Sequence, residues 1–147
     1  MLEKINVSAG VLFHVGPDGL YRVCLGKRAN TKNHLGFWEF PGGKVEPGES
    51  LVAALHREIW EELQIKIFLP KLISSYSFVA LDKLIEVHFF KANTDAETLA
   101  STSHDRIYWF TIQELQTFFK DQSQEKILPA DQSMLKMITN SLFEVTS

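Results

Sequence analysis

Three glutamates, Glu58, Glu61 and Glu62, have the spacing that brings carboxylates together on an α-helix. Residues at i, i+3 and i+4 project from one helical face, so the three side chains share a single turn. Like charges placed in this way repel each other unless a cation lies among them. Because all of these ligands are hard oxygens, the spacing favours a Mg2+ or Mn2+ site over a zinc site.

Arg57 and Glu49 flank this acidic cluster, and an ion pair between them would hold it in register. Gly42 and Gly43 come before the helix, where glycine permits a close approach that a side chain would block. Their carbonyl oxygens are further candidate ligands for the metal. The alternative interpretation of the same charges is a solvated helical face with no metal.

The elements that must position these residues follow from the hydrophobic pattern. Apolar residues at helical spacing predict a helix from position 49 to about 63, after the breaker Pro47-Gly48. Residues 112–120 and 132–143 also read as helices. Strands are predicted at 5–15, 20–25, 37–40, 65–69, 74–81, 84–90 and 107–110. This order predicts an α/β fold, in which a mixed β-sheet is covered by helices on both faces.

Composition narrows the class of protein. A chain of 147 residues with 45% hydrophobic residues predicts a single domain over 1–147 that needs no structural metal. The formal charge of −3 argues against binding of a nucleic-acid polymer through a basic face. The only cysteine, Cys24, lies in an apolar run and is expected to be a buried thiol. With no leader-like segment and no long apolar run, we expect a cytoplasmic protein without a membrane span.

The segment from Gly43 to Ile65 resembles the signature of the Nudix hydrolase family. That signature places a glycine, a glutamate six residues later, then Arg-Glu, an aliphatic residue and Glu-Glu, as Gly43, Glu49, Arg57, Glu58 and the following residues do. The one departure is Gln64, which stands where the family has a glycine that closes the helix. Gln64 supplies no metal ligand, so only the local turn is in question.

The resemblance implies an α/β/α sandwich and hydrolysis of a nucleoside diphosphate linked to another group. It also implies that Glu58, Glu61 and Glu62 bind the divalent metal, with Glu58 as the base for the attacking water and the Gly42 carbonyl as a further ligand. Arg57 would belong to the same catalytic cluster. A catalytically silent, nucleotide-binding Nudix module is the alternative, although such modules usually lose the carboxylates that are all present here.

Outside this signature, the chain resembles the MutT branch of the family, whose members convert damaged nucleoside triphosphates to monophosphate and pyrophosphate. The resemblance implies sanitisation of the nucleotide pool for DNA replication and repair. It also implies four substrate-binding residues. Arg28 would contact a phosphate or the ribose, and Phe40 would border the base. Lys44 would lie near the phosphates, and Lys83 would face the substrate. The structural alternatives are solvated loop charges for the cations and a core aromatic for Phe40.

Asp131 stands where the bacterial 8-oxo-dGTP enzyme has an asparagine that reads the base. An ionised aspartate accepts hydrogen bonds but does not donate them. Relatives with aspartate in this segment include pyrimidine triphosphatases, so hydrolysis of CTP or modified dCTP is the alternative activity. Asp131 is equally a candidate N-cap of the last helix, with no role in substrate binding.

Where this branch commonly has a loop glutamate that binds the metal, this chain has Ser103, with His104 and Asp105 adjacent. His104 or Asp105 is a candidate substitute, but we expect the three helical glutamates with water ligands to suffice. The residues Ala80 and Leu81 stand where ADP-ribose and dinucleoside-polyphosphate enzymes have a marker residue, which disfavours those branches. The implied partner is a small nucleotide, bound by a monomer or homodimer.

Overall fold

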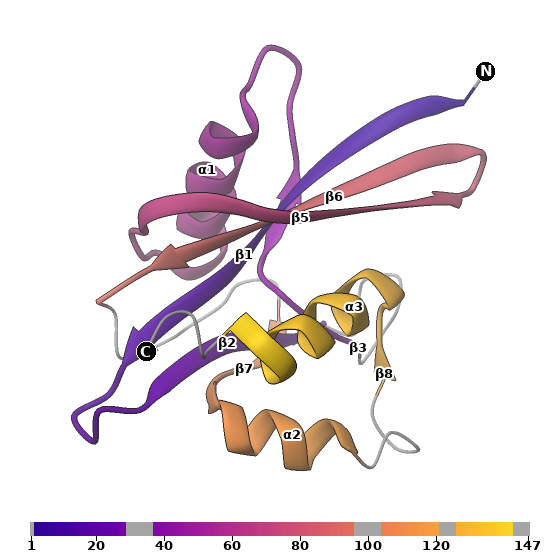
Figure 1. Ribbon diagram of the computed structural model, residues 1–147. Coiled ribbons are helices and arrows are strands. Elements are labelled where there is room, and N and C mark those ends of the chain that lie inside the picture. Colours follow the sequence, from indigo (N-terminus) through magenta and orange to yellow (C-terminus); the bar gives the residue numbers. More distant parts are fainter. Residues whose placement is uncertain (1, 29–36, 96–103, 121–125, 143–147) are drawn as a thin grey trace.

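An eight-stranded mixed sheet organises the chain (Figure 1). The structure is a computed structural model that describes residues 2–28, 37–95, 104–120 and 126–142. Its strands are β1 (Glu3–Val15), β2 (Tyr21–Arg28), β3 (Phe37–Glu39), β4 (Gly42–Lys44), β5 (Phe68–Ala80), β6 (Lys83–Asn93), β7 (His104–Thr111) and β8 (Lys126–Ile127). The sheet order is β5-β6-β1-β2-β3-β8, with β4 paired to β1 and β7 to β2. The β1–β6 and β3–β8 pairs are parallel and the other pairs are antiparallel, as expected for a mixed sheet.

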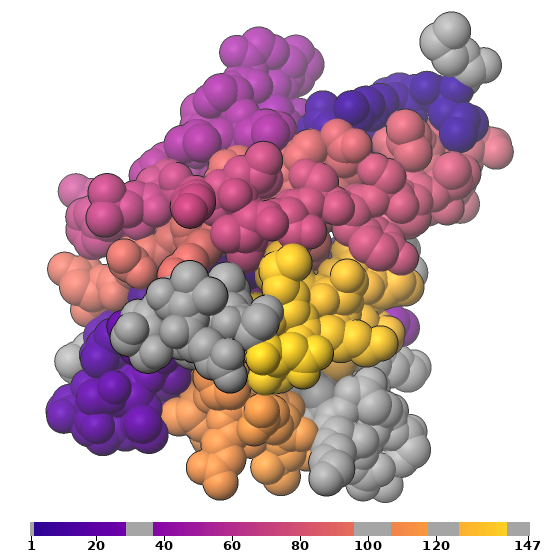
Figure 2. Space-filling view, in the orientation of Figure 1, coloured from indigo at the N-terminus to yellow at the C-terminus, as the bar shows by residue number. Residues whose placement is uncertain are grey.

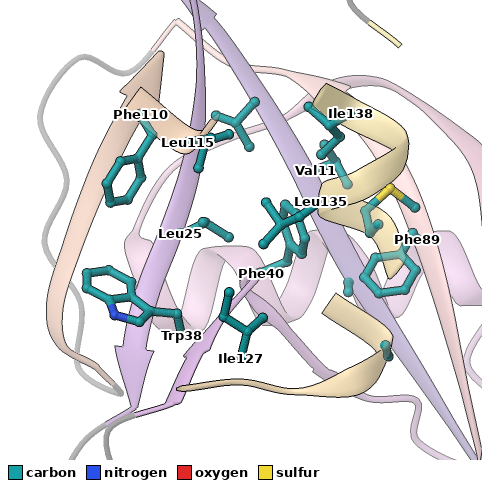
Figure 3. Packing of buried hydrophobic residues seen from close by; sticks show 14 of the residues in the cluster. Val11, Leu25, Trp38, Phe40, Phe89, Phe110, Leu115, Ile127, Leu135 and Ile138 are labelled. Carbon is teal, nitrogen blue, oxygen red and sulfur yellow. The ribbon is translucent and has the colours of Figure 1, made fainter. Parts of the chain in front are cut away.

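Helices cover both faces of this sheet. The helix α1 (Leu51–Leu63) lies on one face, whereas α2 (Ile112–Lys120), α3 (Pro129–Met137) and the π-helical turn η1 (Ile138–Leu142) lie on the other (Figure 1). Successive side chains of β1 point to opposite faces of the sheet, so β1 contributes to the hydrophobic core on each face. Leu12 packs in the cluster with α1, whereas Val11 and Phe13 pack in the cluster with α3. Figure 3 shows the α3 cluster, which includes Phe40 and Phe89. The predicted three-layer α/β architecture is confirmed.

The observed element boundaries differ from the predicted ones at several positions. The two strands expected at 65–69 and 74–81 are one strand, β5, with irregular register at Phe68/Lys71 and Leu72/Ser74. Ile65 and Ile67 are buried beside α1 without belonging to a strand, so their apolar character reflects core packing. The short strands β4 and β8 were not predicted, because two or three residues are too few to show alternation. The last helix begins earlier than expected, at Pro129, where proline suits the first helical position.

β6 pairs with β1 over residues 3–13 and with β5 on its other side, and one end of this three-stranded ribbon projects past α3 (Figure 2). Its turn contains Leu81 and Asp82, which both have positive φ angles, 50° and 62°. Because successive side chains on a strand alternate between faces, the ribbon presents one set of residues on the α3 side and another on the α1 side. Among the described residues, no helix has the length and hydropathy needed to cross a membrane.

Candidate active site on the first helix and the adjoining sheet

The ends of α1 set the positions of its glutamates. The N-cap Ser50 accepts a hydrogen bond from the Ala53 amide at 3.0 Å, which satisfies one of the unpaired donors of the first turn. At the other end, Gln64 adopts a left-handed conformation with φ 58° and ψ 36°. Its amide donates to the Trp60 carbonyl at 2.9 Å. Gln64 therefore performs the helix-closing turn that the family assigns to glycine.

Arg57 connects the acidic residues before and along α1. Its Nε and Nη2 donate to the two carboxylate oxygens of Glu49 at 2.7 and 2.9 Å, a bidentate ion pair. Its Nη1 also lies 2.8 Å from a Glu58 oxygen and 3.2 Å from a Glu61 oxygen. The hydrogen bonds from Arg57 lower the pKa of Glu49 to about 2. The ion pair expected from the sequence is thus present, and it holds the loop before α1 against the helix.

The backbone of Gly42 and Gly43 lies directly against the glutamate side chains. A Cβ atom on Gly43 would stand 2.3 Å from Cδ of Glu58, and one on Gly42 would stand 2.1 Å from the Ser8 carbonyl oxygen. The Gly42 amide donates to Oε1 of Glu62 at 3.1 Å. Only glycine leaves room for these approaches. Glu58 and Glu62 therefore face the strand that the sequence placed beside them.

The donor set of this region suits a hard divalent cation. Glu58, Glu61 and Glu62, hereafter the acidic turn, offer carboxylate oxygens within one turn of α1, and the Gly42 backbone adjoins Glu62. In the part of the chain that the structure describes, no three acidic, histidine or cysteine side chains already surround one point as a metal site. Arg57 instead contacts one oxygen each of Glu58 and Glu61. The residues fit the chemistry of Mg2+ or Mn2+, and metal binding would have to redirect these oxygens.

Asp131 lies on the opposite helical layer and is 7% exposed. Its Oδ1 accepts a hydrogen bond from the Phe40 amide at 3.3 Å. Burial, followed by the nearby charge of Glu39, raises the pKa of Asp131 to about 8. At neutral pH this carboxyl is mostly protonated, so it can donate one hydrogen bond as well as accept others.

The structure corrects the capping alternative for Asp131. The N-cap of α3 is Leu128, which makes no capping bond through its side chain, and Asp131 lies within the first turn. The carboxyl reaches across to β3 and Phe40 because its side chain points into the interior of the fold. Its position is set by tertiary contact and not by the helix end.

Arg28 adjoins this region at the end of β2. Its Nη1 donates to Oε1 of Glu39 at 2.9 Å. Its Nε is buried and has no hydrogen-bond partner among the described residues. Phe40 is 3% exposed and its ring packs edge-on against Phe89 with centroids 5.8 Å apart, so its amide, and not its ring, is what the residue presents to Asp131.

An apolar surface missed by the sequence reasoning continues from this point along the ribbon. It consists of two cross-strand rows, Val7, Val87 and Tyr76, then Ile5, Ile85 and Phe78, hereafter the apolar shelf. Val87 and Tyr76 pack against the core that contains Phe40 and Phe89, and Phe78 is 39% exposed beside Tyr76, with ring centroids 6.2 Å apart. The sequence feature that could have revealed the apolar shelf is the alternation of apolar and polar residues in 84–90, which indicates a half-exposed sheet face.

The two lysines predicted to bind substrate, Lys44 and Lys83, form no hydrogen bond or ion pair with Asp131, Phe40 or Arg28 among the described residues. Lys83 is the first residue of β6, at the turn of the ribbon, and its Nζ is 3.9 Å from Oε2 of Glu3. Lys44 is exposed, and its carbonyl oxygen accepts from Nη2 of Arg57 at 3.0 Å. Ser103 and the side chains of His104 and Asp105, the candidate fourth ligands, lie outside the described residues.

Comparisons with known proteins show a family match over most of the chain. The model of the NUDIX domain family matches residues 4–131. A CTP pyrophosphohydrolase of Escherichia coli is 29% identical over 135 residues, which cover 92% of this chain and 91% of that protein. An 8-oxo-dGTP diphosphatase of Proteus vulgaris is 36% identical over 89 residues, 60% of this chain and 75% of that protein.

Solved structures give the same fold. The solution structure of the E. coli ORF135 protein has a TM-score of 0.72 and 29% identity, covering 93% of this chain and 89% of that one. The crystal structure of a MutT NUDIX hydrolase from Burkholderia pseudomallei has a TM-score of 0.74 and covers 93% of this chain and 99% of that chain, at 21% identity. With the family model spanning most of the chain and the acidic turn complete, this protein belongs to the Nudix hydrolase family and is a MutT-like nucleotide hydrolase.

Proposed function

We propose that this protein is a Mg2+-dependent nucleoside triphosphate pyrophosphohydrolase that acts on oxidised nucleotides such as 8-oxo-dGTP. Water adds to the phosphate chain, the phosphoanhydride bond breaks, and nucleoside monophosphate and pyrophosphate are released. The proposal takes residues 1–147 as one domain, supported by the family match over 4–131. Mn2+ has the same ligand preferences and could replace Mg2+.

The acidic turn supplies the catalytic half of the proposal. Glu58, Glu61, Glu62 and the Gly42 carbonyl would hold the cation, which neutralises the charge that develops on the phosphates. Glu58 is the base that takes the proton from the attacking water. Arg57 orients Glu58 through its hydrogen bond and is itself held by Glu49. Lys44 and Lys83 are assigned to the substrate, with Lys44 beside the phosphates.

Asp131 is the observation that carries the proposal for the base, because it favours a base that presents a donor beside an acceptor. A protonated carboxyl presents one donor and one acceptor, and the Phe40 amide adjoins it. Guanine offers two acceptors, N7 and O6, on its major-groove edge. Oxidation at C8 puts a hydrogen on N7, which turns that edge into a donor beside an acceptor and makes it complementary to Asp131. The apolar shelf and the Arg28 side chain would adjoin the bound nucleoside.

Cytosine is the second candidate, because its N4 donor and N3 acceptor match the same carboxyl. The similarity to a CTP pyrophosphohydrolase over 92% of this chain favours it independently. Both bases fit a protonated Asp131, and their relative rates of hydrolysis distinguish the two candidates.

The test is release of pyrophosphate and orthophosphate with Mg2+, and again with EDTA, from 8-oxo-dGTP, dGTP, CTP, 5-methyl-dCTP, ADP-ribose and diadenosine tetraphosphate. We expect pyrophosphate from 8-oxo-dGTP in preference to dGTP, and none with EDTA. Preference for the cytidine nucleotides would establish the second candidate. Cleavage of ADP-ribose or diadenosine tetraphosphate alone, or activity that survives EDTA, would overturn both.

A further inference from the structure

The α1 side of the ribbon carries a polar network directly behind the apolar shelf. It consists of Lys4, Asn6, Ser75, Ser77, Glu86 and His88, which come from all three strands of the ribbon. These residues alternate with the shelf residues along each strand, so the two sets occupy opposite faces of the same backbone. Neither the metal site nor the base contacts described above use them.

His88 is the centre of this network and is 8% exposed. Its Nδ1 lies 2.9 Å from Oγ of Ser75 on β5, and its Nε2 lies 3.1 Å from Oδ1 of Asn6 on β1. Its Nε2 also lies 3.2 Å from Oε1 of Glu86. Because burial lowers the pKa of His88, its ring is mostly neutral at pH 7 and has one donor and one acceptor nitrogen. With Nε2 protonated, both are used: Nε2 donates to Asn6 or Glu86, and Nδ1 accepts from the Ser75 hydroxyl.

Glu86 also joins β1, β6 and β5 through its side chain, one cross-strand row of this face nearer the turn of the ribbon than His88. Its carboxylate accepts from Nζ of Lys4 on β1 at 3.1 Å and from Oγ of Ser77 on β5 at 3.0 Å. Ser8, the residue of β1 directly opposite His88, does not join this network, since its Oγ donates to the Leu51 carbonyl at the start of α1. The helix therefore anchors the sheet as far as the row of Ser8 and His88, and side-chain contacts of His88 and Glu86 join the three strands from that row outward.

We propose that His88 is a positioning residue for the substrate's base: by joining β5, β6 and β1 it fixes the spacing of the apolar shelf on the opposite face. Val87 lies between Glu86 and His88 in the chain, and Tyr76 lies between Ser75 and Ser77. A shift of either strand would move these shelf residues by the same amount, because they share the backbone. The inference rests on the proposed function, in which the shelf adjoins the base.

The experiment separates binding of the base from binding of the phosphates. The first variant is His88→Leu, which removes the ring contacts with Ser75, Asn6 and Glu86. The second is His88→Gln, which restores an amide donor and acceptor, and the third is Ser75→Ala, which removes one contact at an exposed residue. His14→Leu is the matched control, because His14 is a strand histidine of β1 whose Nδ1 contacts the Thr94 carbonyl, outside the ribbon network. Steady-state kinetics use the preferred nucleoside triphosphate, and inorganic tripolyphosphate is the competitive inhibitor without a base.

We expect His88→Leu to raise KM for the nucleotide about tenfold, the effect of one or two hydrogen bonds, while kcat and the inhibition constant of tripolyphosphate stay unchanged. Ser75→Ala should raise KM less, and His88→Gln should recover most of the loss. His14→Leu should leave KM unchanged even where the melting temperature falls.

Three results would overturn the inference: an unchanged KM in His88→Leu and Ser75→Ala, a parallel loss in kcat and in tripolyphosphate binding, or an equal KM change in His14→Leu. If His88→Leu does not fold, Ser75→Ala and His88→Gln decide the question. Failure of the proposed function is recognised separately, since the unmodified protein would then hydrolyse no nucleoside triphosphate.

Discussion

Glu49, just before α1, and Asp131, in the opposite helical layer, use the same chemical group in opposite ways. Beside α1, hydrogen bonds from Arg57 lower the pKa of Glu49 to about 2 and keep its charge in place. At Asp131, burial raises the pKa of the carboxyl to about 8 and keeps it mostly neutral. Charged carboxylates attract a cation, whereas a neutral carboxyl can both donate to and accept from a base. In the proposed function, one fold thus separates chemistry on the phosphates from recognition of the base.

The two regions also differ in how the chain assembles them. Gly43, Glu49, Arg57 and the acidic turn belong to one continuous segment, and helical spacing brings most of them together. The hydrogen bond between Phe40 and Asp131 instead joins residues 91 positions apart. Local changes should therefore disable the first region selectively, and changes in burial should alter the second.

The largest effect is expected from Glu58→Gln. Loss of the carboxylate removes the proposed base and one metal ligand, so kcat should fall at least about a hundredfold while the fold persists. Glu46→Gln is the control, because Glu46 lies 3.7 Å from Arg57 with a 65% exposed side chain. Unchanged turnover in Glu58→Gln would remove Glu58 from the mechanism.

Gly43→Ala tests whether the strand beside α1 sets the position of Glu58. The new methyl group would meet Cδ of Glu58 at 2.3 Å and push the carboxylate away. We expect kcat to fall about tenfold, a size typical of a misplaced catalytic group, with a smaller change in melting temperature. Wild-type kcat in this variant would show that Glu58 acts from another position.

Asp131→Asn tests whether the buried carboxyl of Asp131 is protonated in the folded protein, through the pH dependence of stability. The pKa of Asp131 is raised from 3.8 to about 8 in the folded protein, so between these values the native state holds a proton that the unfolded state has lost. Its contribution to stability is complete below about pH 4 and is lost as pH rises towards 8, by at most about 1.4 kcal/mol per pH unit.

The melting temperature of the unmodified protein should therefore fall between pH 5 and 8, and Asp131→Asn should flatten this slope. Asp18→Asn is the control, because Arg22 lowers the pKa of that exposed carboxyl below this window. An identical slope in Asp131→Asn would mean that Asp131 is ionised in the folded protein at neutral pH.

The smallest effect is expected from Gln64→Gly at the end of α1. Glycine adopts the left-handed conformation without strain, so stability should rise by about 0.5 kcal/mol in spite of the lost bond from Gln64 to the Trp60 carbonyl. Chemical denaturation measures the change, and kcat should remain as it is. A loss of stability would show that the side-chain bond outweighs the strain.

Much of the fold was predictable, because α1, α2 and the long strands carry strong periodicity. The joining of 65–69 and 74–81 into β5 was not, since register irregularities interrupt the alternation on which the prediction depends. The protonated state of Asp131 was also beyond reach, because a pKa depends on burial and on neighbours such as Glu39.

The sequence by itself determined the helix, its acidic turn and the membership of the family, because these depend on the spacing of residues within one segment. It also determined which strand positions alternate, and so the two-faced character of the ribbon. Only the tertiary structure decided that Phe40 offers its amide to Asp131, that the apolar shelf continues from this contact, and that His88 joins three strands behind it. These features depend on contacts between distant segments, whose geometry is fixed when the sheet and both helical layers pack together.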